Sequence, residues 1–296
     1  MIMRNMLYFS HQQEGWRTLK QIGLFVHSGR ADAPAYAHKV VEALRFAGAS
    51  VWAEEDAARY LHVPPLAQAV QLDALISLGG DGTLLRAMQE AVRLNAPLLG
   101  INLGRVGFLT EVEPENMTDA ITALMGGSYT LEDRRLLRVE LLGTAERFLA
   151  LNDVVVSRGG YARLITLDAL AGDEVVGHYV ADGLIVATPT GSTGYSMSAG
   201  GPVIHPAVDC MVITPICAHS LQHRPVVVPG DECIRLALRH GEEDGVVVQV
   251  DGQTRCCLHP GEILQIQKAE EVVHLVRLSS PRFFPLVREK LTEWTR

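Results

Sequence analysis

The chain has few cysteines, few lysines and no long apolar run. Its 296 residues include five cysteines, an odd number without a C-x-x-C pair, so neither a disulfide framework nor a zinc site is expected, and a reduced, cytoplasmic location fits. Only four of the 26 basic residues are lysine, and 34 acidic residues bring the net charge to −8. This balance argues against a general nucleic-acid or anionic-membrane binder. No run approaches the roughly 18 apolar residues of a membrane span, and no secretory signal is expected at the N-terminus.

Two glycine motifs of nucleotide-binding proteins are also missing. The chain has no G-x-x-x-x-G-K-[ST], so it is not a P-loop enzyme, and no G-x-G-x-x-G follows the first expected strand. Apolar residues make up 48% and charged residues 20% of the chain, as in ordinary globular proteins. At roughly 150 residues per domain, the length predicts two domains. Any phosphate chemistry in them must use another kind of glycine turn.

Short apolar runs alternate with helical patterns over residues 1–130, which we assign to one domain. Buried strands are expected at Ile22–His27, Ser50–Ala53, Asp73–Leu78 and Leu98–Asn102. Apolar stripes at helical spacing follow three of these strands, around residues 40–47, 84–92 and 117–124. Such alternation predicts a parallel sheet with helices on its faces.

Residues 131–279 show an almost purely β pattern, which predicts a second domain. Strands are expected at Leu136–Leu142, Arg147–Val156, Leu164–Leu170, Val175–Val180, Leu184–Ala187, Met211–Ile216, Glu232–Leu238, Val246–Val250, Ile263–Ile266 and Val272–Arg277. Glycine-containing turn signals separate many of them, which is typical of a sandwich or a barrel. A last helical pattern, Phe283–Trp294, is expected to return to the first domain as part of residues 280–296.

The strand expected at Asp73–Leu78 runs directly into a glycine-rich turn, Gly79–Thr83 (GGDGT). Its three glycines tolerate unusual backbone angles and let the phosphates of another molecule approach the main chain. N–H groups at the start of the following helix add positive potential, so the turn is a candidate anion site. Asp81 in this turn could hold a metal ion or take a proton from an attacking hydroxyl. The alternative is a tight turn in which Asp81 only caps the helix.

A second cluster of glycines and hydroxyls lies in the β half, at Asp182-Gly183 and Thr188–Pro202. Hydroxyls and backbone N–H groups suit contacts with ribose and phosphate, and Tyr195 could lie against a base or a ribose. A long solvated loop is the alternative, although structureless loops of this length are uncommon in compact domains unless they are functional.

These motifs together resemble those of the NAD kinase family. The matching segments stand in the family's order and span roughly residues 22–285: Gly79–Thr83, Asn102–Leu109, Asn152-Asp153, Asp182-Gly183, Thr188–Ser198, Pro215–Leu221 and Asp251–Gln253. The GGDG turn alone would be weak evidence, because lipid kinases and 6-phosphofructokinases carry related turns. The ordered set is much more specific.

The resemblance implies transfer of the γ-phosphoryl group of ATP to the 2′-hydroxyl of the adenosine ribose of NAD, giving NADP and ADP. It also implies a divalent metal cation, usually Mg²⁺, whose ligands stay unknown, and a homodimer or homotetramer in the cytoplasm. The implied fold is a Rossmann-like α/β domain that carries the GGDGT turn and a β-sandwich-like domain that binds NAD, with the active site between them. Nucleic acid and membranes are not expected as partners.

The resemblance assigns residue roles as well. Asp81 matches the proton acceptor of the family, and Gly82 would let the ribose or the phosphates approach the main chain. Asn152 and Asp153 would hydrogen-bond the adenosine portion of NAD. The remaining expected contacts with the dinucleotide are Asp182, Thr193, Gly194, Tyr195, Ser196, Met197, Ser198 and Gln253.

Some positions depart from the family pattern. Many members have glutamate where this chain has Asp153, some bacterial members have arginine at the position of Val180, and alanine is commoner at Gly194. Arg163, where the family often has a basic or imidazole side chain, could replace an arginine at position 180. Arg86, one helical turn after the GGDGT turn, could point back at phosphate or be a solvated helix arginine.

Two other kinds of function compete with an NAD kinase. The first is a lipid or sugar kinase of the same superfamily, but the chain has no basic amphipathic segment for membranes. The second is a non-catalytic NAD(H) sensor that keeps the pocket. Asp81 argues against a sensor, because a binder would gain affinity by losing this charge near phosphates.

Overall fold

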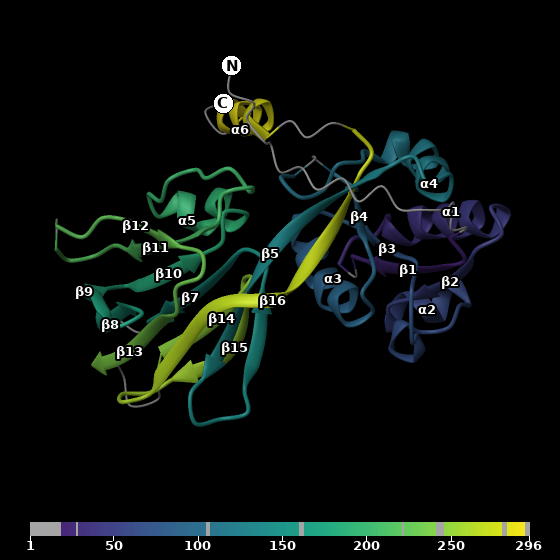
Figure 1. Cartoon of the computed structure of the whole chain (residues 1–296). Coiled ribbons are helices and arrows are strands. Elements are labelled where there is room, and N and C mark those ends of the chain that lie inside the picture. Colours follow the sequence, from purple (N-terminus) through teal and green to yellow (C-terminus); the bar gives the residue numbers. More distant parts are fainter. Residues whose placement is uncertain are drawn as a thin grey trace, which may run out of the picture. The chain divides into compact units, whose positions relative to one another are not determined.

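The chain forms two compact units in the computed structural model shown in Figure 1. The structure describes residues 19–27, 29–104, 107–159, 163–220, 222–240, 246–279 and 283–293. The first unit combines the chain up to Asp133 with the segment from Val273 onwards, and the second comprises Arg134–Val272. The chain passes between the units within strands β5 and β16. In the described part, no helix has the length and hydropathy that a membrane crossing requires.

The first unit is built on a parallel sheet in the order β2-β1-β3-β4-β16. Its strands are β1 (Gln21–Val26), β2 (Ser50–Ala53), β3 (Ala74–Leu78), β4 (Leu98–Ile101) and the end of β16 (Ile263–Arg277). Its helices are α1 (Ala33–Phe46), α2 (Glu55–Leu61), α3 (Asp81–Arg93), α4 (Met117–Met125) and α6 (Phe283–Glu293), with short 3-10 turns η1 (Leu66–Gln68) and η2 (Pro114–Asn116). The predicted parallel sheet with helices is confirmed.

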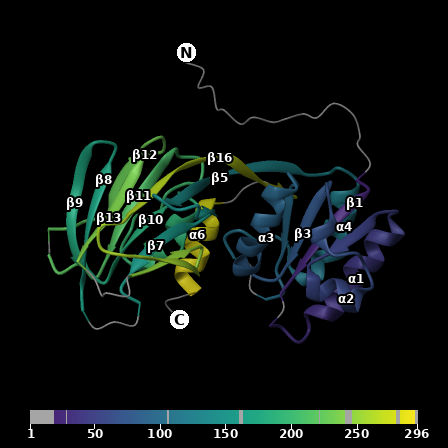
Figure 2. The same ribbon diagram turned by 90° about the horizontal axis from the view of Figure 1, so that it is seen from below.

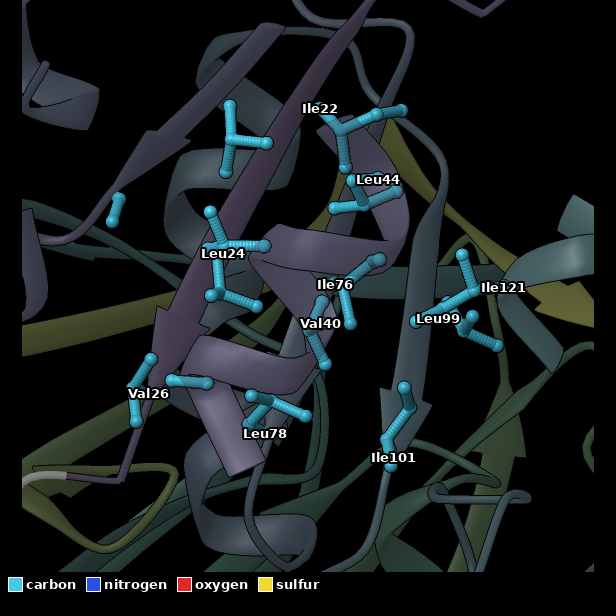
Figure 3. Packing of buried hydrophobic residues seen from close by; sticks show 14 of the residues in the cluster. Ile22, Leu24, Val26, Val40, Leu44, Ile76, Leu78, Leu99, Ile101 and Ile121 are labelled. Atoms are coloured by element: carbon cyan, nitrogen blue, oxygen red, sulfur yellow. The ribbon is translucent and has the colours of Figure 1, made fainter. Parts of the chain in front are cut away.

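Helices cover both faces of this parallel sheet. Val40 and Leu44 of α1 and Ile121 of α4 point at the sheet residues Ile76 and Leu99 in Figure 3, and all five side chains are buried. Helix α3 lies on the other side of the sheet from α1 and α4 (Figure 1). Because α3 packs mainly on β3 and β4, its N-terminus is placed at the carboxyl ends of these two strands.

The second unit is a sandwich of two antiparallel sheets (Figure 2). One sheet has the order β16-β13-β8-β9, and in it β5 also pairs with β16 and β6 pairs with β5. The other sheet has the order β12-β11-β10-β7-β14-β15. The strands are β5 (Thr130–Leu141), β6 (Arg147–Ala150), β7 (Asp153–Ser157), β8 (Ile165–Ala171), β9 (Glu174–Ala181), β10 (Gly183–Ala187), β11 (Cys210–Ile216), β12 (Val226–Pro229), β13 (Ile234–His240), β14 (Val246–Val250) and β15 (Gln253–Leu258). Both sheets supply one core, with Leu167 and Leu236 from the first and Val154 and Val248 from the second. This shared core decides for a sandwich rather than a barrel.

Several expected elements need correction. The single strand expected at Arg147–Val156 is two strands, β6 and β7, because the chain turns at Leu151-Asn152. The two strands expected between residues 263 and 277 are one, because the charged middle of β16 alternates: Ala269 is buried, and the exposed Lys268 beside it pairs with Asp209. Helix α2 and strands β12 and β15 were not expected; each is short and has only one or a few fully buried residues.

Candidate active site

The GGDGT turn lies at the carboxyl end of β3, where the strand order of the parallel sheet reverses between β1 and β3. Ligands of open α/β sheets bind at such switch points. Gly79 must lack a side chain, because a Cβ there would fall on Thr83. Gly80 occupies the N-cap position of α3 and Asp81 is the first helical residue, so Asp81 is not the helix cap of the alternative interpretation. The N–H of Thr83 donates to the Gly80 carbonyl (2.9 Å), so the N–H groups of Asp81 and Gly82, the first two residues of α3, are the ones that can face an anion.

The carboxylate of Asp81 is held by the loop that follows β4. Its Oδ2 accepts a hydrogen bond from the N–H of Phe108 (2.7 Å). Its Oδ1 accepts from the N–H groups of Leu109 (3.2 Å) and Thr110 (3.1 Å) and from the Thr110 hydroxyl (3.1 Å). Gly107 is required here, because a Cβ would overlap the Asp81 carboxyl group. With three donors on Oδ1 and one on Oδ2, Oδ2 has the freer lone pair for a further proton.

Two glycines lie close to the side chain of Asn102, which follows β4 at the start of the loop that holds this carboxylate. Asn102 is buried, and its Oδ1 accepts a hydrogen bond from the Gly104 N–H (3.0 Å). A Cβ at Gly80 would lie 3.9 Å from that same oxygen, and a Cβ at Gly104 would lie 3.2 Å from an Nη1 of Arg30. Arg30 also pairs with Asp32. No sequence motif points to Arg30, which lies far from the glycine motifs along the chain.

In the second unit, the turn at Asn152 and Asp153 is clamped by the hairpin between β14 and β15. The hairpin has positive φ angles at Asp251 (49°) and Gly252 (75°), as its Asp-Gly sequence favours. The Asp251 carboxylate accepts hydrogen bonds from the N–H groups of Leu151 (2.8 Å), Asn152 (2.7 Å) and Asp153 (3.1 Å). Asp251 thereby fixes the backbone of the turn.

Both side chains of this turn have unused acceptor capacity. Among the described residues, none donates a hydrogen bond to the buried Oδ1 of Asn152. Burial raises the pKa of Asp153 to about 7, and the nearby charge of Asp251 acts in the same direction. Burial also raises the pKa of Asp251, against the lowering effect of its three backbone donors. A buried amide oxygen without a donor in the described part of the chain, beside a buried carboxyl group, suits the N–H and O–H groups of a nucleoside.

The glycine and hydroxyl segment packs on the same turn. Thr188 donates from Oγ1 to the Leu151 carbonyl (2.6 Å), and its N–H donates to the Asn152 carbonyl (2.9 Å). A Cβ at Gly191 would fall on the backbone of Asn152, so only glycine fits there. The segment forms η3 (Gly191–Thr193) and α5 (Tyr195–Ser198) rather than a solvated loop.

Comparison with known proteins places this arrangement in a family. Residues 22–129 match the N-terminal domain of ATP-NAD kinases, and residues 151–278 match the C-terminal domain of ATP-NAD kinases. The chain belongs to the NAD kinase family. An NAD kinase of Symbiobacterium thermophilum is 40% identical over 283 residues, which cover 93% of this chain and 99% of that protein. An NAD kinase of Moorella thermoacetica is 43% identical over 232 residues, which cover 76% and 73%.

Two solved structures of related enzymes are similar to this chain. The crystal structure of an NAD kinase from Archaeoglobus fulgidus in complex with ATP matches with a TM-score of 0.71 and 28% identity, over 93% of this chain and 99% of that one. A yeast NADH kinase complexed with NADH shares the fold, with a TM-score of 0.86 and 24% identity over 93% and 88% of the two chains. The predicted NAD kinase function is confirmed, and a lipid or sugar kinase is not supported.

Within this NAD kinase, the remaining residues expected to contact the dinucleotide differ in exposure. Thr193 and Ser196 are buried, and the Ser196 hydroxyl shares a hydrogen bond with Thr214 (2.8 Å). The ring of Tyr195 is 45% exposed at the start of α5. Gly194, Met197 and Gln253 are half-buried and Ser198 is exposed. Their contacts with the dinucleotide stay a prediction.

The charged residues of the sequence-based set show partners that the motifs did not indicate. Asp182 pairs with Arg158 at 2.7 Å, so its carboxylate is already partly neutralised. Arg163 is exposed. Arg86 is exposed and stacks its guanidinium over the ring of Phe25, 5.5 Å from the ring centre. Arg105, Val106, Leu221 and Trp294, which belong to expected segments, lie outside the described residues.

The raised pKa of Asp153 predicts how stability depends on pH. The carboxyl group binds its proton more tightly in the folded chain than in the unfolded chain, where the pKa is about 3.9. Its favourable contribution is therefore complete below pH 4 and is lost as the pH rises to about 7. Asp153→Asn should remove this loss. We expect the variant to exceed the wild type in unfolding free energy at pH 8 by up to roughly 4 kcal/mol, and by much less at pH 4.

Urea unfolding followed by circular dichroism between pH 4 and 8 measures this difference. Asp231→Asn, at an exposed position in the turn between β12 and β13, is the matched control. An Asp153→Asn curve that parallels the wild-type curve at every pH would show that Asp153 is not the titrating group.

Proposed function

We propose that this NAD kinase transfers the γ-phosphoryl group of ATP to the 2′-hydroxyl of NAD with Asp81 as the proton acceptor. The observation that carries this proposal is the carboxylate of Asp81, fixed by four donors at the N-terminus of α3 with Oδ2 the less occupied oxygen. The ribose oxygen forms a bond to the γ-phosphorus, the bond from that phosphorus to the β–γ bridging oxygen breaks, and ADP leaves. The hydroxyl proton passes to Asp81.

An aspartate is a weak base for an alcohol, but this does not count against the role. In a loose phosphoryl-transfer transition state, the proton leaves late, so the position of the acceptor matters more than its strength. The glycines at positions 80 and 82 and the first-turn N–H groups of α3 would receive phosphate oxygens there. Gly82 has open space around it, since a Cβ would meet nothing within 4 Å.

In the second unit, we assign the adenosine portion of NAD to the Asn152 and Asp153 turn. The Asn152 amide would serve the base, and the Asp153 carboxylate would accept from a ribose hydroxyl. Gly194 lies against both side chains, because a Cβ there would be 3.7 Å from Asn152 Nδ2 and 3.7 Å from Asp153 Oδ2. This closeness supports an approach of the ligand over the glycine.

A divalent cation fits this chemistry if it arrives with ATP. Among the described residues, no group of three or more histidine, cysteine, aspartate or glutamate side chains is arranged to hold a metal ion. Mg²⁺ commonly takes one or two carboxylates together with substrate phosphates and water, and Asp81 is the carboxylate available at the turn. When bound, the cation would neutralise charge on the transferring phosphoryl group.

Homo-oligomeric assembly and a cytoplasmic location also belong to this proposal. Light scattering of the purified chain tests the first, and cell fractionation tests the second.

The decisive experiment incubates the purified full chain with NAD, ATP and Mg²⁺ and detects NADP with an NADP-specific dehydrogenase. We expect NADP and ADP to form in equal amounts and only when both substrates are present. Reactions with NAD, ATP or the metal left out are the controls. An absence of NADP with every divalent metal tried would refute the proposal, and tight NAD binding without turnover would favour the sensor.

A further inference from the structure

Arg277, the last residue of β16, is a buried cation inside the first unit. Its side chain is 10% exposed, and its Nε donates to Glu132 (2.6 Å). Its Nη1 lies 3.6 Å from a carboxylate oxygen of Glu111 and donates to the backbone carbonyl of Leu109 (3.2 Å). Two glutamates would be enough to neutralise the guanidinium. The third contact is with a main-chain carbonyl, which accepts from one of the remaining N–H donors of the guanidinium.

The carbonyl that Arg277 contacts belongs to the same peptide group that binds Asp81. The C=O of Leu109 accepts from Arg277, and the N–H of the same peptide, on Thr110, donates to Oδ1 of Asp81 (3.1 Å). In a trans peptide these two groups point in opposite directions. Arg277 and Asp81 thus bind opposite edges of one peptide group, which joins the buried residues Leu109 and Thr110.

A cation on the carbonyl side changes what the N–H side can do. It polarises the peptide, so that the N–H becomes a stronger donor to the carboxylate. It also fixes the loop in space, because a charge-assisted hydrogen bond in a buried site resists displacement. Glu111, in the same loop, helps to fix the loop, because its carboxylate accepts hydrogen bonds from both the N–H (2.8 Å) and the hydroxyl (2.6 Å) of Ser279.

We propose that Arg277 is a positioning residue for the phosphoryl transfer, which acts on Asp81 through the Leu109–Thr110 peptide without touching a substrate. This inference rests on the role of Asp81 proposed above. The competing interpretation is that Arg277 only anchors the end of β16 through Glu111 and Glu132. The two differ in one respect: a positioning residue matters for turnover only while Asp81 is present.

Arg277→Lys tests the proposal, because an ammonium keeps the charge near one glutamate but cannot fork between the carbonyl and both carboxylates. We expect kcat to fall about tenfold, with the KM values for NAD and ATP within about twofold of the wild type. In the Asp81→Asn background the same substitution should change kcat by less than about twofold, because the residue through which it acts is gone. Single-turnover reactions with enzyme in excess keep the slow variants measurable.

Arg93→Lys is the matched control. Arg93 makes a similar bridge in the same unit, to the Leu66 carbonyl (3.0 Å) and to Glu90 (2.6 Å), at the opposite end of α3 from Asp81. We expect its kcat to stay within about twofold of the wild type. Thermal melting of every variant reports whether it is folded.

Two outcomes would overturn the proposal: a folded Arg277→Lys variant with wild-type kcat, or a loss of kcat that is equally large in the Asp81→Asn background. If Arg277→Lys does not fold, Glu132→Gln replaces it, since that change leaves the arginine in place and removes the charge that orients Nε. A reduction of kcat by about threefold that disappears without Asp81 supports the proposal, and no reduction overturns it. Failure of the wild type to form NADP, or normal turnover of Asp81→Asn, would instead identify the proposed function as wrong.

Discussion

Asp81→Asn is expected to lower kcat by about 100-fold or more while NAD binding changes by only a few-fold. A positioned proton acceptor contributes factors of this size, and an amide cannot accept the hydroxyl proton. NAD binding is spared because the adenosine contacts proposed here come from Asn152 and Asp153. Single-turnover NADP formation gives the rate, and calorimetric titration with NAD gives the affinity.

The structure adds an effect on stability to this expectation. Both oxygens of Asp81 accept from N–H groups, with Phe108 on one and Leu109 and Thr110 on the other. An asparagine must direct its NH₂ group at one of these donors, which leaves a buried donor unsatisfied at about 1–3 kcal/mol. We therefore expect a lower melting temperature together with the loss of rate.

Asp119→Asn is the control for this experiment, because Asp119 is also in the first turn of a helix but is exposed. It should leave the rate unchanged and alter stability by a few tenths of a kcal/mol at most. A kcat for Asp81→Asn within a few-fold of the wild type would refute the role of proton acceptor, whatever the change in melting temperature.

The sequence predicts the fold well where the local pattern and the final packing agree. The strand at Ser50–Ala53 was predicted with its observed bounds, because its short apolar run lies between the turn at Gly48 and the acidic start of α2 at Glu54. The interpretation of Arg147–Val156 as one strand was wrong because only Asn152 and Asp153 interrupt an otherwise apolar run. What interrupts the strand is the capture of three backbone N–H groups by Asp251, about 100 positions away. The turn to which we assign the adenosine portion of NAD is thus where local prediction fails.

The candidate site shows the same division between local and distant information. The GGDGT turn and the Thr188–Ser198 segment are each contiguous in the sequence, so their composition makes each a candidate phosphate or ribose site. The contacts of Arg277 join residues 168 and 145 positions apart in the sequence, and Arg30 reaches Gly104 from another strand-helix unit. No spacing rule connects such residues, because the sheet order of the folded chain brings them together.

Gly191→Ala is expected to disrupt the NAD half of the site. A Cβ at this position would lie 2.7 Å from the Cα of Asn152 and closer still to its carbonyl group, and backbone atoms cannot rotate away as a side chain can. The Asn152 turn must therefore shift, although Asp251 and Thr188 hold it from both sides. We expect a loss of about 1–3 kcal/mol in unfolding free energy and at least about a tenfold weaker affinity for NAD.

Gly194→Ala is the natural comparison for this variant, because it adds the same methyl group to the same segment. Its nearest atom would be the Gly191 carbonyl oxygen at 3.3 Å, with the Asn152 and Asp153 side chains at 3.7 Å, so small adjustments suffice. Its affinity for NAD should fall by about threefold or less. Urea unfolding measures the stability of both variants, and calorimetric titration measures their affinity for NAD. Equal losses in the two variants would mean that added bulk, rather than displacement of the Asn152 backbone, weakens binding.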